Sequence, residues 1–327
     1  MAAGTTRKIS AASARAHTRR PKPKNSSKFS AWAYQATKPP PPKTCGSTDG
    51  PPVTAPRIQL KDGRHLAYKE YGVPKDIAKH KIVFVHGFDS CRHDVSALTA
   101  NLSPDIVESK GIYIVSFDRP GYGESDPHPT RTVESLALDI EELADKLGLG
   151  SKFHVVGFSM GGQVVWSCLK YIPHRSSSGS TGGELLVAFL LQTCRNMHMN
   201  SSLQETNGLF VLLTICHGLP TGGTPKDYSL LQDQAISRQQ GEFESLHRDM
   251  VVGFGTWEFD PTDLKNTFPE GSVHLWQGDD DLLVPVTLQR YIADKLPWIK
   301  YHELSGAGHM FLYADGMADS VIQALIA

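Results

Sequence analysis

Hydrophobic residues fall into two kinds of pattern along the central part of the chain. Continuous runs of β-branched and aromatic residues stand at Ile82–Val85, Ile112–Phe117 and Phe153–Val156. Such runs are typical of strands buried on both faces of a parallel sheet. From Thr132 to Leu147, apolar residues recur every three or four positions, which predicts an amphipathic helix. Strands that alternate with helices predict βαβ units and an α/β fold.

The same alternation returns near the end of the chain, after a long stretch that follows neither pattern. Residues 192–255 contain scattered short apolar runs, and we assign no core face to them. At the other end, two strand-like runs are separated by an Asp-Gly turn, which predicts a hairpin. The remaining predicted elements are strands at Arg57–Leu60, His65–Tyr71, Glu184–Leu191, Ser272–Trp276 and Ile299–Leu304, and helices at Val95–Leu102, Gln163–Tyr171, Val286–Leu296 and Met310–Ile326.

The first 55 residues differ from the rest in composition. Residues 1–48 hold ten Lys or Arg and no Asp or Glu, together with many Ala, Ser, Thr and Pro. A segment of this kind has too little apolar surface to order itself, so we predict a disordered basic tail over 1–55 and one domain over 56–327. The tail also has the composition of an organelle transit peptide, and Arg19–Lys24 fits a nuclear address. The location expected from these features is the cytosol or the chloroplast.

Charge, cysteines and apolar runs narrow the class of protein further. Without the ten basic residues of the tail, 23 Lys and Arg remain against 34 Asp and Glu. An acidic body argues against nucleic-acid binding by the main domain. Five cysteines without a Cys-x-x-Cys pair fit a reduced intracellular protein and predict no metal site. The longest apolar runs, Leu185–Leu191 and Leu209–Cys216, are too short to span a membrane.

The most informative short stretch is Gly157-Phe158-Ser159-Met160-Gly161-Gly162, which we call the elbow. It has the form Gly-x-Ser-x-Gly and lies between a predicted strand and a predicted helix. That arrangement lifts a serine hydroxyl onto a sharp turn above a sheet. The turn is tight, so the residues two positions away from Ser159 must be small, and both are glycines. We therefore expect Ser159 to be a nucleophile.

A base and an acid are predicted from the loops after the last two strands. His309 follows Gly306-Ala307-Gly308, and a histidine side chain is the kind of base that can take a serine proton near neutral pH. Asp281, in an acidic turn before Val284-Pro285, is the candidate that would hold the imidazole, with Asp280 as the fallback. The loops beyond the carboxyl ends of parallel strands meet at one edge of a sheet, where functional residues collect.

An acyl-transfer site also needs hydrogen-bond donors for an oxyanion. The backbone N–H groups of Phe88 and Met160 are the candidates, one after His86-Gly87 and one at the start of the helix after Ser159. His86 is expected to support this loop rather than to act as a base. For Arg92 and His93, a place at the entrance and a plain surface role both stay open.

Taken together, these stretches resemble the α/β-hydrolase superfamily. The resemblance is carried by His86-Gly87-Phe88, Asp118-x-x-Gly121-x-Gly123-x-Ser125, the elbow, Asp281-x-x-Val284-Pro285 and Gly306-x-Gly308-His309, in that order. Ser, Asp and His follow one another as in the triad of that family. The nearest likeness is to uncharacterised plant serine-hydrolase-type members, which share the Asp-Arg-Pro-Gly-Tyr-Gly-Glu-Ser loop.

The resemblance implies a fold and a set of expectations about chemistry. The family has a mostly parallel eight-stranded sheet with helices on both faces, a helical cap, no cofactor, and substrates that include esters, lipids, thioesters and amides. This sequence departs from the family in the cap, which is short and atypical at about 192–255 and follows a Ser/Gly-rich insertion. Family members that open epoxides or haloalkanes use an Asp nucleophile, so Ser159 argues against those reactions.

The sequence therefore predicts a serine hydrolase of the carboxylesterase or lipase type, which cleaves a small-molecule ester or lipid through an acyl-enzyme. Three alternatives stay open: a lipase or acyltransferase, a ligand-binding receptor on a hydrolase scaffold, and an inactive pseudoenzyme with a damaged cap. The sequence makes no prediction of oligomeric state.

Overall fold

The computed structural model describes residues 40–173, 185–190 and 234–327. The chain divides into two units, Met1–Pro40 and Pro41–Ala327. The predicted tail thus falls largely outside the described residues, as do residues 192–233 of the predicted cap, and for these segments the sequence expectations stay predictions. The boundary of the second unit lies before residue 55. The stretch up to Ala55 contacts the domain, since the backbone N–H of Thr54 donates to Glu124 at 2.7 Å.

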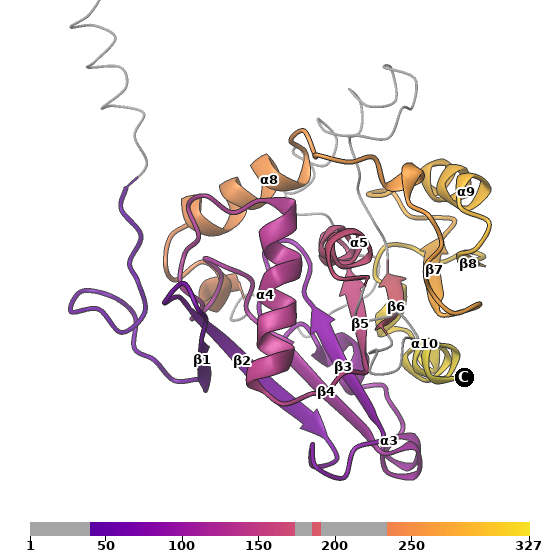
Figure 1. Cartoon of the computed structure of the whole chain (residues 1–327), viewed down its shortest axis with the longest axis horizontal. Helices are drawn as coiled ribbons and strands as arrows, with labels where there is room; N and C mark the ends of the chain where they lie inside the picture. The colour runs from indigo at the N-terminus through magenta and orange to yellow at the C-terminus, as the bar shows by residue number, and fades with distance from the viewer. Residues whose placement is uncertain (1–39, 174–184, 191–233) are drawn as a thin grey trace, which may run out of the picture. The chain divides into compact units, whose positions relative to one another are not determined.

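An eight-stranded sheet forms the centre of the second unit (Figure 1), in the order β1-β2-β4-β3-β5-β6-β7-β8. Strands β1 and β2 form the expected antiparallel hairpin, and β2 also runs antiparallel to β4. All pairs from β4 to β8 are parallel. The predicted α/β-hydrolase sheet is confirmed. The strands are β1 (Arg57–Gln59), β2 (His65–Gly72), β3 (His80–Val85), β4 (Ile112–Phe117), β5 (Phe153–Phe158), β6 (Leu185–Leu190), β7 (Val273–Gly278) and β8 (Lys300–Leu304).

Helices cover both faces of this sheet and enclose two hydrophobic cores (Figure 1). Alternate residues of a strand point to opposite faces, so Val83 and Val85 of β3 join one core while Ile82 and Phe84 join the other. The first core lies under α4 (Val133–Lys146), α5 (Gly161–Tyr171) and α9 (Val286–Lys295). The second lies under α2 (Ser96–Thr99), α3 (Pro104–Lys110) and α10 (Met317–Ile326).

Local signals explain where the helices begin and end, including where our prediction differs. Helix α4 begins with a capping box, in which Thr132 and Ser135 each accept the other's backbone N–H. The predicted helix over Val95–Leu102 is shorter in the structure, and α3 follows it with Pro104 in its first turn and left-handed Gly111 at its end. The last helix begins at Met317 rather than Met310, because Gly316 adopts a left-handed conformation there.

The part of residues 192–255 that the structure describes is helical rather than irregular. It contains η2 (Phe243–His247), a single π-helical turn, and α8 (Arg248–Gly253). Two 3-10 turns follow later in the chain, η3 (Pro261–Asp263) and η4 (Phe311–Tyr313). Within the described ranges, no helix combines the length and the apolar composition that a bilayer crossing requires.

Candidate active site

The elbow occupies the turn between β5 and α5, and its serine is held in an unusual backbone conformation. Ser159 has φ of 52°, in the left-handed region that residues other than glycine rarely adopt. A Cβ on Gly157 would stand 2.5 Å from the carbonyl oxygen of Gly161, and one on Gly161 would stand 2.2 Å from that of Val85. Both distances are too short for a side chain, so the backbone passes through this turn only with glycine at these two positions.

His309 lies directly against Ser159. Its Nε2 is 3.1 Å from Ser159 Oγ, and its Nδ1 is 3.0 Å and 3.2 Å from the two carboxylate oxygens of Asp281. A carboxylate only accepts, so Nδ1 must carry the proton that it shares with Asp281. The other nitrogen, Nε2, is then the acceptor that faces the serine hydroxyl. The three side chains form one line of hydrogen bonds, although they come from three loops far apart in the sequence.

The carboxylate that reaches His309 is that of Asp281, which is buried, whereas Asp280 is exposed. One oxygen of Asp281 accepts the backbone N–H groups of Leu283 at 2.8 Å and Val284 at 2.9 Å. Burial alone would raise the pKa of Asp281, but the His309 hydrogen bond and these backbone donors outweigh it and lower the pKa. The carboxylate is therefore ionised at neutral pH.

The loop after β3 passes close to Ser159. A Cβ on Gly87 would lie 3.2 Å from Ser159 Cβ, so the absence of a side chain there lets the two loops approach. Phe88 follows Gly87 on this loop, and Met160 follows Ser159 at the start of α5. Within the described part of the chain, neither backbone N–H donates a hydrogen bond to the protein. Phe88 thus follows a residue that lies against Ser159, and Met160 follows Ser159 itself. Their role as oxyanion donors stays a prediction.

His86 is bonded through both ring nitrogens. Its Nε2 accepts the backbone N–H of Arg119 at 3.0 Å, so its Nδ1 carries the proton that is donated to the Gly87 oxygen at 2.8 Å. Full burial, with the Arg119 charge nearby, lowers the pKa of His86 well below its ordinary value. The imidazole is neutral and fixed, which favours the support role over that of a base.

A cluster of buried polar and charged side chains contacts the loop after β3, and the sequence did not predict it. The Arg119 guanidinium donates to the Gly87 oxygen at 2.8 Å and to both carboxylate oxygens of Asp249 at 2.5 Å and 2.7 Å. The Tyr122 hydroxyl adds a third hydrogen bond to Asp249 at 2.8 Å. Asp249 belongs to α8, and nothing in the sequence around it marks it as a partner of residues 130 positions away.

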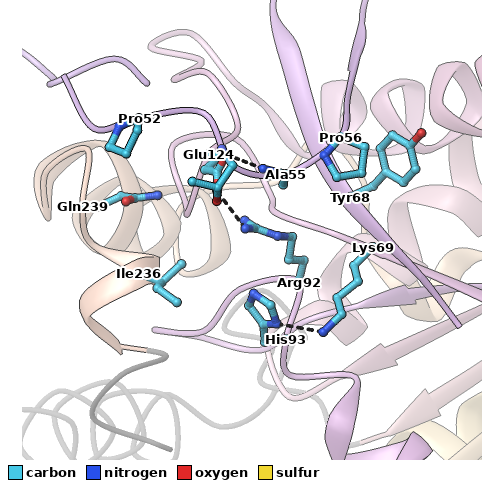
Figure 2. Close-up of a pocket in the computed structure, with 11 residues that line it drawn as sticks. Pro52, Ala55, Pro56, Tyr68, Lys69, Arg92, His93, Glu124, Ile236 and Gln239 are labelled. Carbon is cyan, nitrogen blue, oxygen red and sulfur yellow. Dashed lines mark hydrogen bonds and ion pairs between the residues drawn. The ribbon is translucent and has the colours of Figure 1, made fainter. Parts of the chain in front are cut away.

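Arg92 and His93, for which the sequence left two roles open, both line a pocket in the described part of the chain. Arg92 is only 5% exposed and is paired with Asp118 and Glu124, so the surface interpretation is wrong for it. Figure 2 shows both residues beside a pocket of about 400 Å³. Ser159, Asp281 and His309 are not among the residues that line this pocket. Its lining residues are Pro52, Thr54, Ala55, Pro56, Tyr68, Lys69, Arg92, His93, Glu124, Ile236 and Gln239.

Solved structures with similar folds include several hydrolases. An esterase from Exiguobacterium antarcticum matches with a TM-score of 0.61 at 16% identity, covering 84% of this chain and 100% of that chain. The enol-lactonase of Burkholderia xenovorans LB400 matches with a TM-score of 0.61 at 17% identity, covering 83% and 100%. A structure described among epoxide hydrolases from hot-environment metagenomes gives 0.59 at 18%, covering 84% and 99%. At these identities the likeness establishes the fold alone.

The family model gives the membership. Residues 82–323, about three quarters of the chain, match the model described as the alpha/beta hydrolase family. The match begins at β3, before His86, and ends beyond His309, so it spans the elbow and the loops that carry Asp281 and His309. This protein belongs to the alpha/beta hydrolase family.

Proposed function

We propose that the protein is a serine hydrolase that cleaves carboxylic esters, with Ser159 as nucleophile, His309 as base and Asp281 as the acid that orients it. The observation that supports this most strongly is the line of hydrogen bonds from Ser159 Oγ through His309 to Asp281. A serine hydroxyl is a weak nucleophile until a neighbouring base takes its proton. In a Ser-His-Asp triad, the base contacts the serine hydroxyl and the carboxylate holds the base, which is the order of contacts in this site.

The first half of the proposed reaction is acylation. His309 Nε2 takes the Ser159 hydroxyl proton as Oγ attacks the ester carbonyl carbon, and the carbonyl electron pair moves onto its oxygen. Phe88 and Met160 donate their backbone N–H groups to this oxyanion, and one such donor is typically worth about 3–4 kcal/mol. The tetrahedral intermediate then expels the alcohol, which leaves with the proton from His309, and the acyl group stays on Ser159.

The second half releases the acid. A water molecule gives a proton to His309 Nε2 and its oxygen attacks the acyl carbon. The intermediate collapses, Ser159 Oγ leaves with the proton, and the carboxylic acid is freed. Throughout, the ionised Asp281 stabilises the imidazolium and keeps the correct nitrogen turned to the serine. Asp281 keeps its own negative charge because its pKa is lowered in the folded protein.

Neighbouring folds and local surroundings favour an ester as substrate. An esterase and an enol-lactonase are among the similar structures, and a lactone is a cyclic ester. The epoxide hydrolases of the superfamily use an Asp at the elbow, where this chain has Ser159. Leu282 and Met310, next in sequence to Asp281 and His309, are 72% and 39% exposed. We propose a small or medium apolar acyl group, because pockets for small-molecule ligands are mostly apolar.

Labelling with a fluorophosphonate probe tests the proposal. We expect the wild-type protein to be labelled and the Ser159→Ala variant to remain unlabelled. A panel of nitrophenyl esters of increasing chain length then defines the acyl preference, and a preference for long chains would contradict the small-acyl part of the proposal. Matching circular dichroism spectra for the two proteins establish that the serine, and not the fold, causes the difference.

The main competitor is a receptor on the same scaffold that binds a small molecule without turnover. A folded wild-type protein that takes no label and turns over no ester would favour that function. The compartment is tested separately, with a reporter fused to residues 1–55. Import into the chloroplast supports the transit peptide, whereas a reporter that stays in the cytosol removes it. The narrower likeness to plant members stays a prediction.

A further inference from the structure

The Phe88 N–H is a proposed oxyanion donor, and its orientation is set by the neighbouring carbonyl of Gly87. The carbonyl of Gly87 and the N–H of Phe88 belong to the same peptide group. A trans peptide is planar and its C=O and N–H point in opposite directions. Any group that holds the Gly87 oxygen in place therefore also sets the direction in which the Phe88 N–H points.

The Gly87 oxygen is held by two buried donors. His86 Nδ1 and Arg119 Nη2 each lie 2.8 Å from it. Arg119 is only 2% exposed and is fixed in turn by its two hydrogen bonds to Asp249 of α8. The oxygen side of the peptide is thus anchored to a helix that lies more than a hundred residues further along the chain.

The residue after Phe88 is anchored to the same part of the chain. Asp89 has φ of 54°, the left-handed conformation that Asp and Asn tolerate better than most residues. Its carboxylate accepts from Arg238 Nε at 2.6 Å, is also bonded to the Arg238 Nη2, and lies 3.3 Å from the hydroxyl of Ser237. Two parallel bonds from a planar guanidinium fix both position and direction. The turn at Asp89 therefore follows the position of Arg238.

We propose that Arg238 is a positioning residue for the oxyanion hole. Through Asp89 it holds the carboxyl-side end of the Phe88 residue, while Arg119 and Asp249 hold the amino-side peptide through the Gly87 oxygen. Both anchors come from residues 237–249, so this stretch acts as a clamp on the loop after β3. The inference depends on the proposed ester hydrolysis, because only then does the Phe88 N–H have an oxyanion to meet.

The Arg238→Gln variant tests this clamp with an ester substrate and a trifluoromethyl ketone. The ketone adds to the serine and places a negative oxygen in the oxyanion hole. Loss of a whole oxyanion donor costs about 10²–10³ in kcat. For a donor that is present but misdirected we expect a fall in kcat of about tenfold to a hundredfold, with KM changed by less than about twofold. Ketone affinity should fall by the same factor as kcat.

Two further variants separate positioning from a general loss of structure. Asp89→Asn retains tolerance for the left-handed backbone but loses the charge, so it should match Arg238→Gln. The double variant should be no worse than either single one, because the two residues act through one contact. Arg238→Lys replaces the planar guanidinium by a single ammonium group. Its kcat should therefore lie between that of Arg238→Gln and that of the wild type.

Arg290→Gln is the matched control. Arg290 of α9 makes a similar pair with Glu303 of β8, joined by two hydrogen bonds, and neither residue belongs to the loop after β3 or to residues 237–249. Its loss should therefore leave kcat unchanged. Wild-type kcat and ketone affinity in Arg238→Gln would overturn the inference. Equal losses in Arg238→Gln and Arg290→Gln would also overturn it. If the proposed hydrolysis itself is wrong, the wild-type protein will fail to turn over ester, and the two failures are thereby distinguished.

Discussion

The two sides of the candidate site are held in place by different means. On the serine and acid side, the contacts are local: glycines two residues from Ser159 shape the elbow, and Asp281 accepts N–H groups from two and three residues away. On the oxyanion side, Arg119 meets a partner 130 positions away and Asp89 meets one 149 positions away. The turns on the first side are therefore shaped mainly by neighbouring residues, whereas the second side is held by partners from distant parts of the chain.

The largest effect should come from the acid on the local side. Asp281→Asn keeps the size of the side chain but offers His309 an amide, which allows the imidazole to turn the wrong nitrogen to Ser159. By analogy with the serine-protease triad, we expect kcat to fall by about 10⁴-fold. Asp280→Asn, one position earlier and exposed, is the control. Steady-state kinetics on one nitrophenyl ester decide between them, and a larger fall for Asp280→Asn would reverse the assignment.

The next largest effect is a loss of unfolding free energy on the oxyanion side, where the contacts are between distant residues. Arg119→Met leaves the buried carboxylate of Asp249 without its main partner, which costs about 3–5 kcal/mol of unfolding free energy. Arg290→Met, on an exposed pair with Glu303, should leave stability nearly unchanged. Urea denaturation measures both. Equal losses in the two variants would show that burial does not distinguish the two ion pairs.

The same contrast explains how much of the molecule could be predicted from its sequence. The strands, the hairpin and the elbow follow from hydrophobic period and glycine spacing, which are properties of neighbouring residues. The grouping of Ser159, Asp281 and His309 could be anticipated because parallel strands end at one edge of a sheet. The Arg119–Asp249 and Asp89–Arg238 pairs could not, since neither α8 nor the sequence around Arg238 has a pattern that links it to its distant partner. Charged pairs of this kind are visible only once the chain is folded.

A third prediction probes how closely the elbow is packed. Gly161→Ala would place a Cβ 2.2 Å from the backbone oxygen of Val85, and a backbone atom cannot move aside cheaply. We expect a loss of about 3 kcal/mol in unfolding free energy, as for other forced overpacking. Gly308→Ala is the control, because its Cβ would find no atom nearer than 4.0 Å. Thermal or urea unfolding of both variants measures the difference, and similar losses would mean that the elbow has room to adjust.

Acid conditions offer a smaller test of the distant side. Burial alone would raise the pKa of Asp249, but Arg119 and Arg131 outweigh it and lower the pKa in the folded protein. As pH falls below the ordinary value of 3.8, the unfolded chain therefore takes up this proton first, and the stabilisation is lost down to the folded pKa. In Asp249→Asn, unfolding free energy should fall less steeply between pH 5 and pH 3 than in the wild type. Parallel slopes in urea titrations would contradict this.

The smallest effect is expected at the two non-glycine residues that have positive φ in the described part of the chain. One lies on the serine side of the site and the other on the oxyanion side. Ser159 and Asp89 have φ of 52° and 54°. Glycine adopts this conformation without strain, and alanine does not. Replacing Ser159 by Gly should therefore give about 1 kcal/mol more stability than replacing it by Ala, with both variants inactive. The measurement is the difference in urea unfolding free energy between the two variants.

Replacing Asp89 by Gly should give a different result from replacing Ser159 by Gly. Asp89→Gly also removes the backbone strain, but it gives up the Arg238 pair, so the two effects oppose each other. We expect the stability of Asp89→Gly to stay within about 1 kcal/mol of the wild type while its kcat falls. Long-range positioning predicts such a separation of activity from stability, because without the carboxylate Arg238 no longer fixes the turn at residue 89. If Asp89→Gly instead keeps full kcat, the turn at residue 89 is set by its own backbone, and the two sides of the site do not differ in the way described.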